Sequence, residues 1–182
     1  MQTLPGPEDV LAFWRAAGPQ KWFGKDAAFD GAIAARFTGL CEAAAAGKLA
    51  SWEDTPESAL ALVLVLDQFP RNIFRGDPRA YACDPRAREV AARARSRRFD
   101  QQVALEERQF FYLPLMHSEQ LKDQECCLEL AKAHGEAEFA RYAQVHADII
   151  RRFGRFPHRN ACLGRGTSSD EQAFLDAGGF AG

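Results

Sequence analysis

The stretch ALALVLVL (residues 59–66) decides the fold, because it is apolar on every side. A helix of this composition has no face to turn toward water, so other helices have to surround it. The stretch LDQFPRN (66–72) shares Leu66 with it and continues with the polar pair Asp67 and Gln68. We expect these two side chains at or below the protein surface, since they finish an otherwise apolar helix. The sequence therefore predicts a helical protein built around residues 59–66.

Helical periodicity dominates the rest of the chain, and strand-like alternation is nearly absent. Start and stop signals support this interpretation. Asp54 or Thr55 precedes Pro56, and Ser168 with Glu171 three residues later forms a capping box. We expect one all-α domain over residues 1–182 with about eight helices. These lie at residues 7–17, 26–46, 56–68, 85–99, 105–112, 119–133 and 136–153, with a short last helix between Ser168 and Gly178.

Three polar segments follow the third, fifth and seventh of these helices. They are LDQFPRN (66–72), LPLMHSE (113–119) and GRFPHRN (154–160), and the first and third are nearly the same sequence. Consecutive helices joined by short loops prefer antiparallel packing, so the C-terminal ends of alternate helices meet at one end of the array. An extra helix within residues 76–83 would reverse this alternation. The sequence thus predicts that the three segments meet at one site.

Composition and charge limit the classes of partner. The net charge is -2 and the isoelectric point is near 6.1, which argues against a dedicated nucleic-acid-binding protein. Arginine outnumbers lysine, which suits anion recognition, but a GC-rich genome produces the same bias. The start MQTLPGPEDV does not resemble a signal peptide, and no apolar run is long enough to span a bilayer. Five cysteines without a CxxC fit reduced thiols. We expect a cytoplasmic protein that binds neither nucleic acid nor membrane.

One interpretation of the three segments is structural. Asn72 or Asn160 would take the left-handed conformation that ends a helix, and Arg71 or Arg155 would bond the last helical carbonyls. In this interpretation the FPRN and FPHRN sequences are helix stops in a rigid scaffold. Buried polar groups are usually structural, so this interpretation stays open.

The other interpretation is a pocket that holds a small anionic ligand. Arginine side chains bind carboxylate and phosphate groups, and histidines and carboxylates supply acid and base groups. His146 lies in the middle of the apolar stripe of residues 139–153, and Gln124 shares a face with His117, so both are expected to be buried. The candidates for acid–base catalysis are His117, Glu119, His158 and Asp67, and those for ligand binding are Arg71, Asn72, Arg75, Gln124, His146, Arg155, Arg159, Asn160 and Arg165.

Other kinds of chemistry are less favoured. Three histidines and two carboxylates fall in the relevant segments, but no HExxH and no close His or Cys pair has ligand spacing, so we expect no metal and no cofactor. Ser118 lacks a nucleophile elbow, and Cys162 in a loop is more often a small filler residue. The arginines of residues 85–99 are not interleaved with aromatic residues, so a solvated face is favoured over an RNA-binding one.

Three long stretches resemble a known family. The sequences LVLVLDQFPRNIFRG, FFYLPLMHSEQLKDQE and HADIIRRFGRFPHRNACLGR are similar to hallmark segments of the bacterial family called domain of unknown function 924. The resemblance implies a tetratricopeptide-like array of antiparallel helix pairs, forming a right-handed superhelix. It brings no established activity. The family motif falls on the candidate residues named above, together with Gln68.

The alternative function from another class is a non-enzymatic scaffold that presents a helical groove to a protein or peptide. The superfamily resemblance favours it, but the individual helices show no tetratricopeptide consensus. The sequence therefore leaves two hypotheses open, a pocket for a small anionic metabolite and an interaction scaffold.

Overall fold

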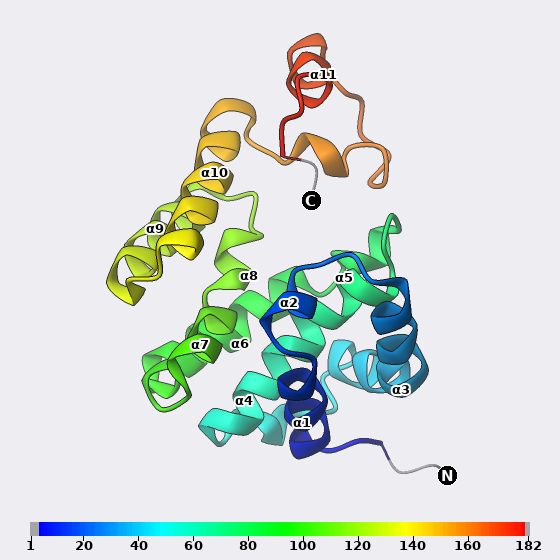
Figure 1. Cartoon of the computed structure of the whole chain (residues 1–182), viewed down its shortest axis with the longest axis vertical. Coiled ribbons are helices and arrows are strands. Elements are labelled where there is room, and N and C mark those ends of the chain that lie inside the picture. Colours follow the sequence, from blue (N-terminus) through cyan, green and yellow to red (C-terminus); the bar gives the residue numbers. More distant parts are fainter. Residues whose placement is uncertain (1–3, 181–182) are drawn as a thin grey trace. The chain divides into compact units, whose positions relative to one another are not determined.

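A computed structural model of the protein describes residues 4–180, and these residues form helices, turns and loops with no strand among them. The prediction of an all-α fold is confirmed. The α-helices, labelled in Figure 1, are α1 (Pro7–Ala17), α2 (Pro19–Trp22), α3 (Ala27–Ala45), α4 (Pro56–Val63), α5 (Phe69–Ile73), α6 (Asp84–Ser96), α7 (Leu105–Arg108), α8 (Leu113–Met116), α9 (Leu121–His134), α10 (Ala137–Phe153) and α11 (Ser169–Asp176).

The chain divides into two compact units. The N-terminal unit contains the residues up to Arg75 and Arg79–Phe111, and the C-terminal unit contains Gly76–Pro78 and the chain from Tyr112 onward. The single domain, the antiparallel pairing throughout and the tetratricopeptide-like superhelix remain predictions.

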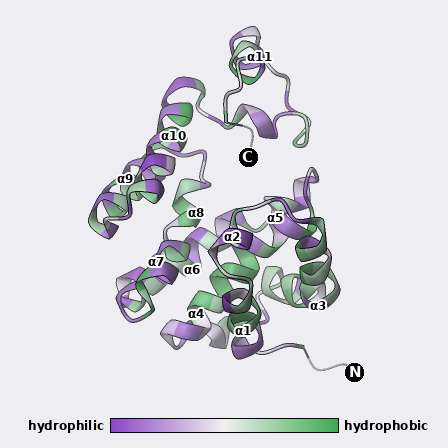
Figure 2. Ribbon diagram, in the orientation of Figure 1, coloured by the Kyte–Doolittle hydropathy of each residue, from purple (hydrophilic) through white to green (hydrophobic). Residues whose placement is uncertain are grey.

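The apolar helix lies in the core of the N-terminal unit. Every residue from Ala59 to Leu66 is buried, as the sequence predicted. Helices α1 and α6 pack against α4, and α3 packs against the turn that continues it. Beyond its first turn α4 is hydrophobic, whereas α9 and α10 show both colours, as helices with one solvent face do (Figure 2). Trp14, at the centre of α1, is fully buried and stacks on Trp22 of α2 with ring centroids 5.9 Å apart.

Helix α4 does not end at the LDQFPRN segment. It continues through a π-helical turn at Leu64–Gln68 into α5, and the N–H of Phe69 bonds the carbonyl of Leu64 five residues back. Pro70 explains this turn, because it has no N–H to donate and its ring would clash with the carbonyl four residues earlier in a regular helix. The prediction that the helix finishes with Asp67 and Gln68 is therefore wrong, and FPRN lies inside a helix that ends near Ile73.

Elsewhere the residues that cap a helix mark its start or end as expected from the sequence. Asp26, Thr55 and Ser168 cap α3, α4 and α11 through their side chains, and Glu171 completes the predicted capping box. Glycine ends α10, where Gly154 has a φ of 69°. The prediction that Asn72 or Asn160 takes a left-handed conformation at a helix end is wrong. Asn160 has a right-handed φ of -58° and Asn72 lies inside α5.

The structure also contains short elements that the sequence did not predict. The expected helix 105–112 is split into α7, a 3₁₀ turn and the start of α8, and α2 follows α1 at once. A 3₁₀ turn at Pro78–Ala80 lies in the segment on which the alternation argument depends. Strict alternation of helix direction can therefore no longer be assumed across residues 76–83. The meeting of all three polar segments remains a prediction.

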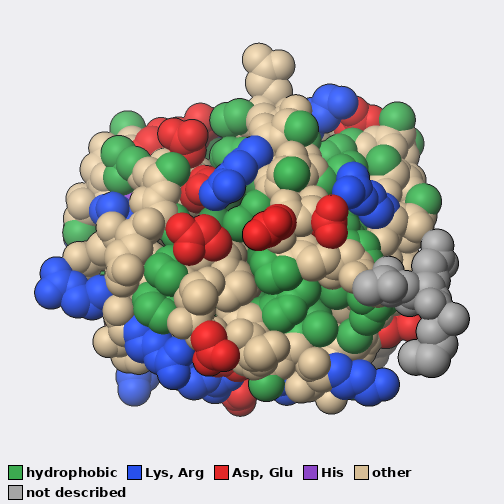
Figure 3. Space-filling model, turned by 90° about the horizontal axis from the view of Figure 1, so that it is seen from below, with side chains coloured by type: hydrophobic (Ala, Val, Ile, Leu, Met, Phe, Trp, Pro, Cys, Tyr) green, Lys and Arg blue, Asp and Glu red, His purple; other side chains and the backbone are tan. Residues whose placement is uncertain are grey.

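The arginine-rich helix α6 uses its charges at the surface of the N-terminal unit. Ala87, Val90, Ala91 and Ala94 form its buried stripe. Arg93 forms a two-point ion pair with Glu53, and Arg97 donates to the Glu53 carbonyl at 2.7 Å. Basic and acidic side chains are interspersed among apolar ones on the face that Figure 3 shows. Such a mixture is typical of an ordinary protein surface.

In the C-terminal unit α9 and α10 lie side by side as an antiparallel pair, joined at Gly135 (Figure 1). The buried side of the pair includes two predicted polar residues, Gln124 of α9 and His146 of α10. The last turn of α10 packs with Phe156 and with aromatic residues of the C-terminal segment. Within residues 4–180, no helix is both long enough and apolar enough to cross a membrane.

Replacing Leu62 with Ala tests the central position of residues 59–66. Leu62 is 1% exposed, so we expect the free energy of unfolding to fall by about 2–5 kcal/mol in urea denaturation. The matched control is Leu105→Ala, at a leucine that is 58% exposed, for which we expect a change within about 0.5 kcal/mol. Equal losses in the two variants would contradict a buried core helix.

Candidate functional site

The arginine of the LDQFPRN segment is held by carboxylates of its own unit. Arg71 donates to both oxygens of Asp84 at 2.9 Å and to the backbone carbonyl of Asp67 at 2.7 Å. The carboxylate of Asp67 lies 3.4 Å away and also accepts from Gln68 Nε2 at 2.6 Å. Burial opposes the charge of Arg71, but Asp67 and Asp84 outweigh it and raise its pKa. Arg71 therefore acts here as a clamp between α5 and the start of α6.

The next two polar residues of this segment converge on Asp30 of α3. Asn72 Nδ2 donates to Asp30 Oδ1 at 2.7 Å, and Arg75 donates to both Asp30 oxygens at 2.6 and 3.1 Å. Burial works to raise the pKa of Asp30, but the hydrogen bonds from Arg75 and Asn72 outweigh it and lower the pKa. Sequence reasoning missed Asp30 and Asp84. The only signal for Asp30 and Asp84 in the sequence is the general one that an arginine within the fold needs a carboxylate partner.

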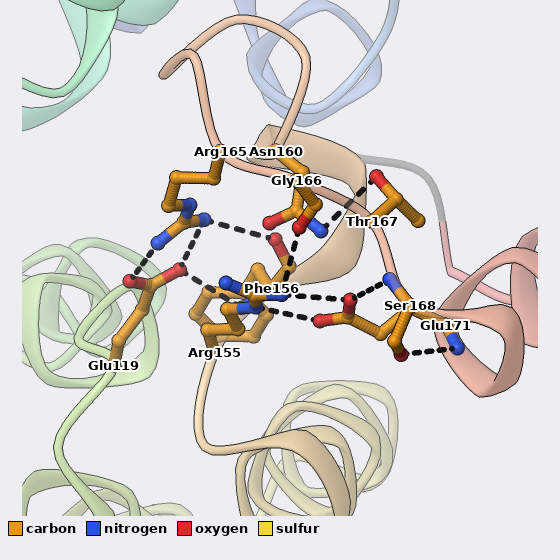
Figure 4. A network of polar contacts seen from close by, with 9 residues as sticks. All are labelled: Glu119, Arg155, Phe156, Asn160, Arg165, Gly166, Thr167, Ser168 and Glu171. Carbon is orange, nitrogen blue, oxygen red and sulfur yellow. Dashed lines mark hydrogen bonds and ion pairs between the residues drawn. The ribbon is translucent and has the colours of Figure 1, made fainter.

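In the C-terminal unit, Glu119 joins the segments LPLMHSE and GRFPHRN. Figure 4 shows it accepting from Arg165 at 2.7 and 3.0 Å and from the backbone N–H of Phe156 at 2.8 Å. Burial works to raise the pKa of Glu119, but Arg165 and the Phe156 N–H stabilise the carboxylate and lower it. The structure thus brings the second and third polar segments together.

Arg155 closes the same network on its other side. It donates to both oxygens of Glu171 at 2.6 and 2.8 Å and to the Gly166 carbonyl at 2.9 Å (Figure 4). The hydrogen bond from Arg155, helped by the Ser168 N–H, lowers the pKa of Glu171 to about 2. The candidate arginines 71, 75, 155 and 165 are therefore each neutralised by a carboxylate within their own unit.

The remaining candidate arginine lies among the histidines. Arg159 is buried, donates through Nη1 to the His117 carbonyl at 3.0 Å, and places its guanidinium 4.4 Å from the Phe156 ring centroid. His146 and His158 lie 5.4 and 5.7 Å from the same ring, and His117 lies 6.5 Å from His146 between ring centroids. We call His117, His146, His158 and Arg159 the histidine cluster.

Two of these histidines are neutral near neutral pH. Burial, with the positive potential of His117 and Arg159, lowers the pKa of His146 to about 3. Its Nδ1 lies 2.8 Å from the Tyr142 carbonyl, which can only accept, so in the neutral ring the proton is on Nδ1. Burial and then Arg159 lower the pKa of His158 to about 4. A neutral imidazole offers one hydrogen-bond donor and one acceptor without a charge.

Two buried amides beside the cluster have oxygens without a hydrogen-bond donor. Gln124 Nε2 donates to the carbonyls of Leu115, Met116 and Ser118 at 3.2, 2.7 and 2.6 Å, which fixes the orientation of the amide. Asn160 hydrogen-bonds Thr167 and Glu171 through its amide nitrogen, so its orientation is fixed as well. The Oε1 of Gln124 and the Oδ1 of Asn160 are buried without a partner, as is His158 Nδ1. Such groups require an explanation, since leaving one unpaired costs about 1–3 kcal/mol.

The predicted residues thus fall into two groups. Asp67, Arg71, Asn72 and Arg75 lie in the N-terminal unit, and the other candidates lie in the C-terminal unit. Across residues 4–180, no three or more His, Cys, Asp and Glu side chains are grouped so that they could hold a metal ion. What the C-terminal group offers chemically is a buried cation, neutral imidazoles and amide oxygens.

Comparison with known proteins gives the family of the chain. The family model of a bacterial protein of unknown function, DUF924, matches residues 10–179. The chain belongs to this family. The resemblance stated from the sequence motifs is therefore confirmed, while the tetratricopeptide-like superfamily remains a prediction.

One solved structure resembles this chain over nearly its whole length. It is the structure of the protein of unknown function ATU0120 from Agrobacterium tumefaciens, with 46% sequence identity and a TM-score of 0.91. The match covers 94% of this chain and 97% of that one. No curated protein matches the sequence. The comparisons thus support the family and the fold, and they supply no activity.

Removing the guanidinium of Arg71 tests whether the first segment is structural. Asp67 has a side chain only 1% exposed, so Arg71→Ala leaves a buried carboxylate without its main cation. We expect the free energy of unfolding to fall by about 3–5 kcal/mol in urea denaturation. Arg141→Ala, at an arginine with a 60% exposed side chain, is the control, with an expected loss below about 1 kcal/mol. A neutral or stabilising Arg71→Ala would instead indicate a residue held for function.

The depressed pKa values of His146 and His158 predict a pH dependence of stability. In the unfolded chain both imidazoles bind protons near pH 6.5, whereas in the folded protein they do so only near pH 3 and 4. The stability that they contribute is therefore complete above pH 6.5 and is lost as the pH falls, by up to about 1.4 kcal/mol per unit for each histidine.

Between about pH 6.5 and pH 4.5 the slope comes mainly from histidines, because Glu119 and Glu171 take up protons below this window. Urea denaturation across that window is expected to show a clear slope in the wild type and about half of that slope in His146→Gln, whose amide does not titrate. Identical slopes in the two proteins would show that His146 is not buried in its neutral form.

Proposed function

We propose that the C-terminal unit binds a small anionic metabolite at the histidine cluster. The observation that carries this proposal is the buried Arg159, whose guanidinium lies against the Phe156 ring and the His117 carbonyl beside two neutral histidines. A cation in such surroundings attracts a negative charge strongly, because little water screens it. A carboxylate or phosphate group is the natural partner of a guanidinium.

The unpaired amide oxygens refine the ligand class. Gln124 Oε1 and Asn160 Oδ1 accept hydrogen bonds and cannot donate them in their fixed orientations. They favour a ligand that carries N–H or O–H donors in addition to its negative group. A monocarboxylate with a primary amide or an amine has this combination, whereas a fully ionised dicarboxylate does not.

Fewer of the predicted acid–base residues remain available for proton transfer. Asp67 and Glu119 are engaged with Arg71 and Arg165, and a general base works best when its pKa is near the working pH. His158, with a pKa of about 4, would accept a proton only from a strongly acidic group. We therefore propose first that the site binds the ligand, and second that His117 or His158 transfers a proton.

The interaction scaffold remains the second candidate. Exposed large apolar side chains favour it, since Phe23 and Leu105 of the N-terminal unit are 59% and 58% exposed. Cytoplasmic location and the lack of a nucleic-acid partner belong to both proposals.

A thermal-shift screen tests ligand binding. The probes are dicarboxylates of three to five carbons, their monoamides, amino acids and phosphorylated metabolites. A ligand at about a hundred times its Kd adds roughly 2.7 kcal/mol, which is an easily measured rise in Tm. We expect succinamate-like compounds to bind and their N,N-dimethyl amides to fail, because the latter lack N–H donors.

Arg159→Met is the decisive variant, since it retains the bulk beside Phe156 and removes the charge. We expect it to abolish the shift for every anionic hit. Arg151→Met, at an arginine of α10 with a 41% exposed side chain, is the matched control and should leave the shift intact. Hits that survive Arg159→Met would place the ligand elsewhere, and silence across the panel would favour the scaffold.

A further inference from the structure

The aromatic residue Phe180, which sequence reasoning did not select, lies on the histidine cluster. Its ring centroid is 4.5 Å from that of His146 and 5.4 Å from that of His158. It also packs against the buried cluster of Ile149, Ile150 and Phe156. One side chain of the C-terminal segment therefore touches two rings of the proposed site, one on α10 and one on the loop that follows it.

Two glycines direct the chain toward this position. Gly178 has a φ of 78°, a left-handed conformation that disfavours other residues. A Cβ on Gly179 would lie 2.5 Å from Cζ of Phe174 and 2.6 Å from the Phe174 carbonyl oxygen, so there is no room for a side chain. The turn after α11 is thus built tightly enough to place Phe180 where it is.

Phe180 packs both on the apolar cluster at the end of α10 and on the two histidine rings. Phe174 of α11 already contacts Phe153 at 5.2 Å and belongs to the same cluster of partly buried residues. Phe180 also covers a neutral imidazole whose Nδ1 is buried without a partner. A hydrophobic ring over polar groups that lack partners keeps water and solutes from them.

We infer that Phe180, positioned by the Gly178–Gly179 turn, is a gate that covers the histidine cluster and competes with the ligand for it. This inference rests on the proposed function, because it names the regulation of the same site. The gate opens when the side chain of Phe180 turns away from His146 and His158. A ligand then has to displace an aromatic side chain, so its observed affinity is reduced by the fraction of closed protein.

The gate is tested first without any ligand, by the rate at which diethyl pyrocarbonate modifies each histidine, read residue by residue with mass spectrometry. In Phe180→Ala we expect the rates at His146 and His158 to rise by about tenfold or more, since the reagent attacks neutral imidazoles that it can reach. His134, at the end of α9, lies outside the cluster and is the internal control. Unchanged rates at His146 and His158 would overturn the inference.

Gly179→Ala is a second variant, which keeps Phe180 but displaces the turn. We expect it to raise the same two rates, whereas Phe180→Leu, which keeps an apolar cover, should raise them far less. Thermal melts of all variants show whether the fold persists. A rise in Phe180→Leu equal to that in Phe180→Ala would also contradict a gate formed by the side chain.

The ligand arm separates this inference from the proposed function. Titration of wild type and Phe180→Ala with succinamate and its three- and five-carbon homologues should show at least about fivefold tighter binding in the variant. Faster modification with no binding to either protein would uphold the gate and overturn the ligand proposal. Binding that weakens in Phe180→Ala would make Phe180 a wall of the site and overturn the gate.

Discussion

The N-terminal unit depends on one constraint, which is that the helix over residues 59–66 has no polar side. Such a helix is stable only when its whole circumference is covered, so α1, α3 and α6 each turn an apolar stripe toward it or toward the turn that continues it. The same constraint places Asp67 and Gln68 below the surface, because they continue the buried helix. Their burial then requires partners, and the Asp67 carboxylate accepts a hydrogen bond from Gln68 and forms an ion pair with Arg71.

Long-range charge pairing is the part of this structure that the sequence could not reveal. Arg75 meets Asp30 across 45 residues and Arg15 meets Glu107 across 92 residues, and no spacing rule links such pairs. Sequence reasoning selected the arginines of the polar segments as groups that hold an anionic ligand or bond the ends of helices. It could not tell a ligand from a carboxylate of the same chain. Most of these arginines turned out to have intramolecular partners, which favours the structural interpretation for them.

The fold was predictable where the deciding signals are local. Side-chain caps at Asp26, Thr55 and Ser168 act within three residues, so the starts of α3, α4 and α11 agree with expectation. The π-helical turn was not predictable in this way, because Pro70 usually ends a helix and here only widens one turn. Asn160 likewise has the residue type of a left-handed cap, but its side chain is bound to Glu171, and the glycine at 154 had already ended the helix.

The two similar sequences FPRN and FPHRN share some contacts and differ in others. Phe69 and Phe156 are both fully buried. Asn72 and Asn160 both donate hydrogen bonds, Asn72 to Asp30 and Asn160 to Thr167 and Glu171. The arginines differ, because Arg71 is clamped by Asp84 whereas Arg159 bonds a backbone carbonyl and lies on an aromatic ring.

The residue that distinguishes the second sequence is His158, inserted between proline and arginine. An insertion that only ended a helix would have no need of an imidazole, and Gly154 already provides the end. Burial makes this ring neutral, and neutrality has a cost in stability at acidic pH that an apolar residue would avoid. The same is true of His146. Above pH 6.5 this cost is absent, so the case for function at the second sequence depends on the buried atoms His158 Nδ1 and Asn160 Oδ1, which have no hydrogen-bond partner.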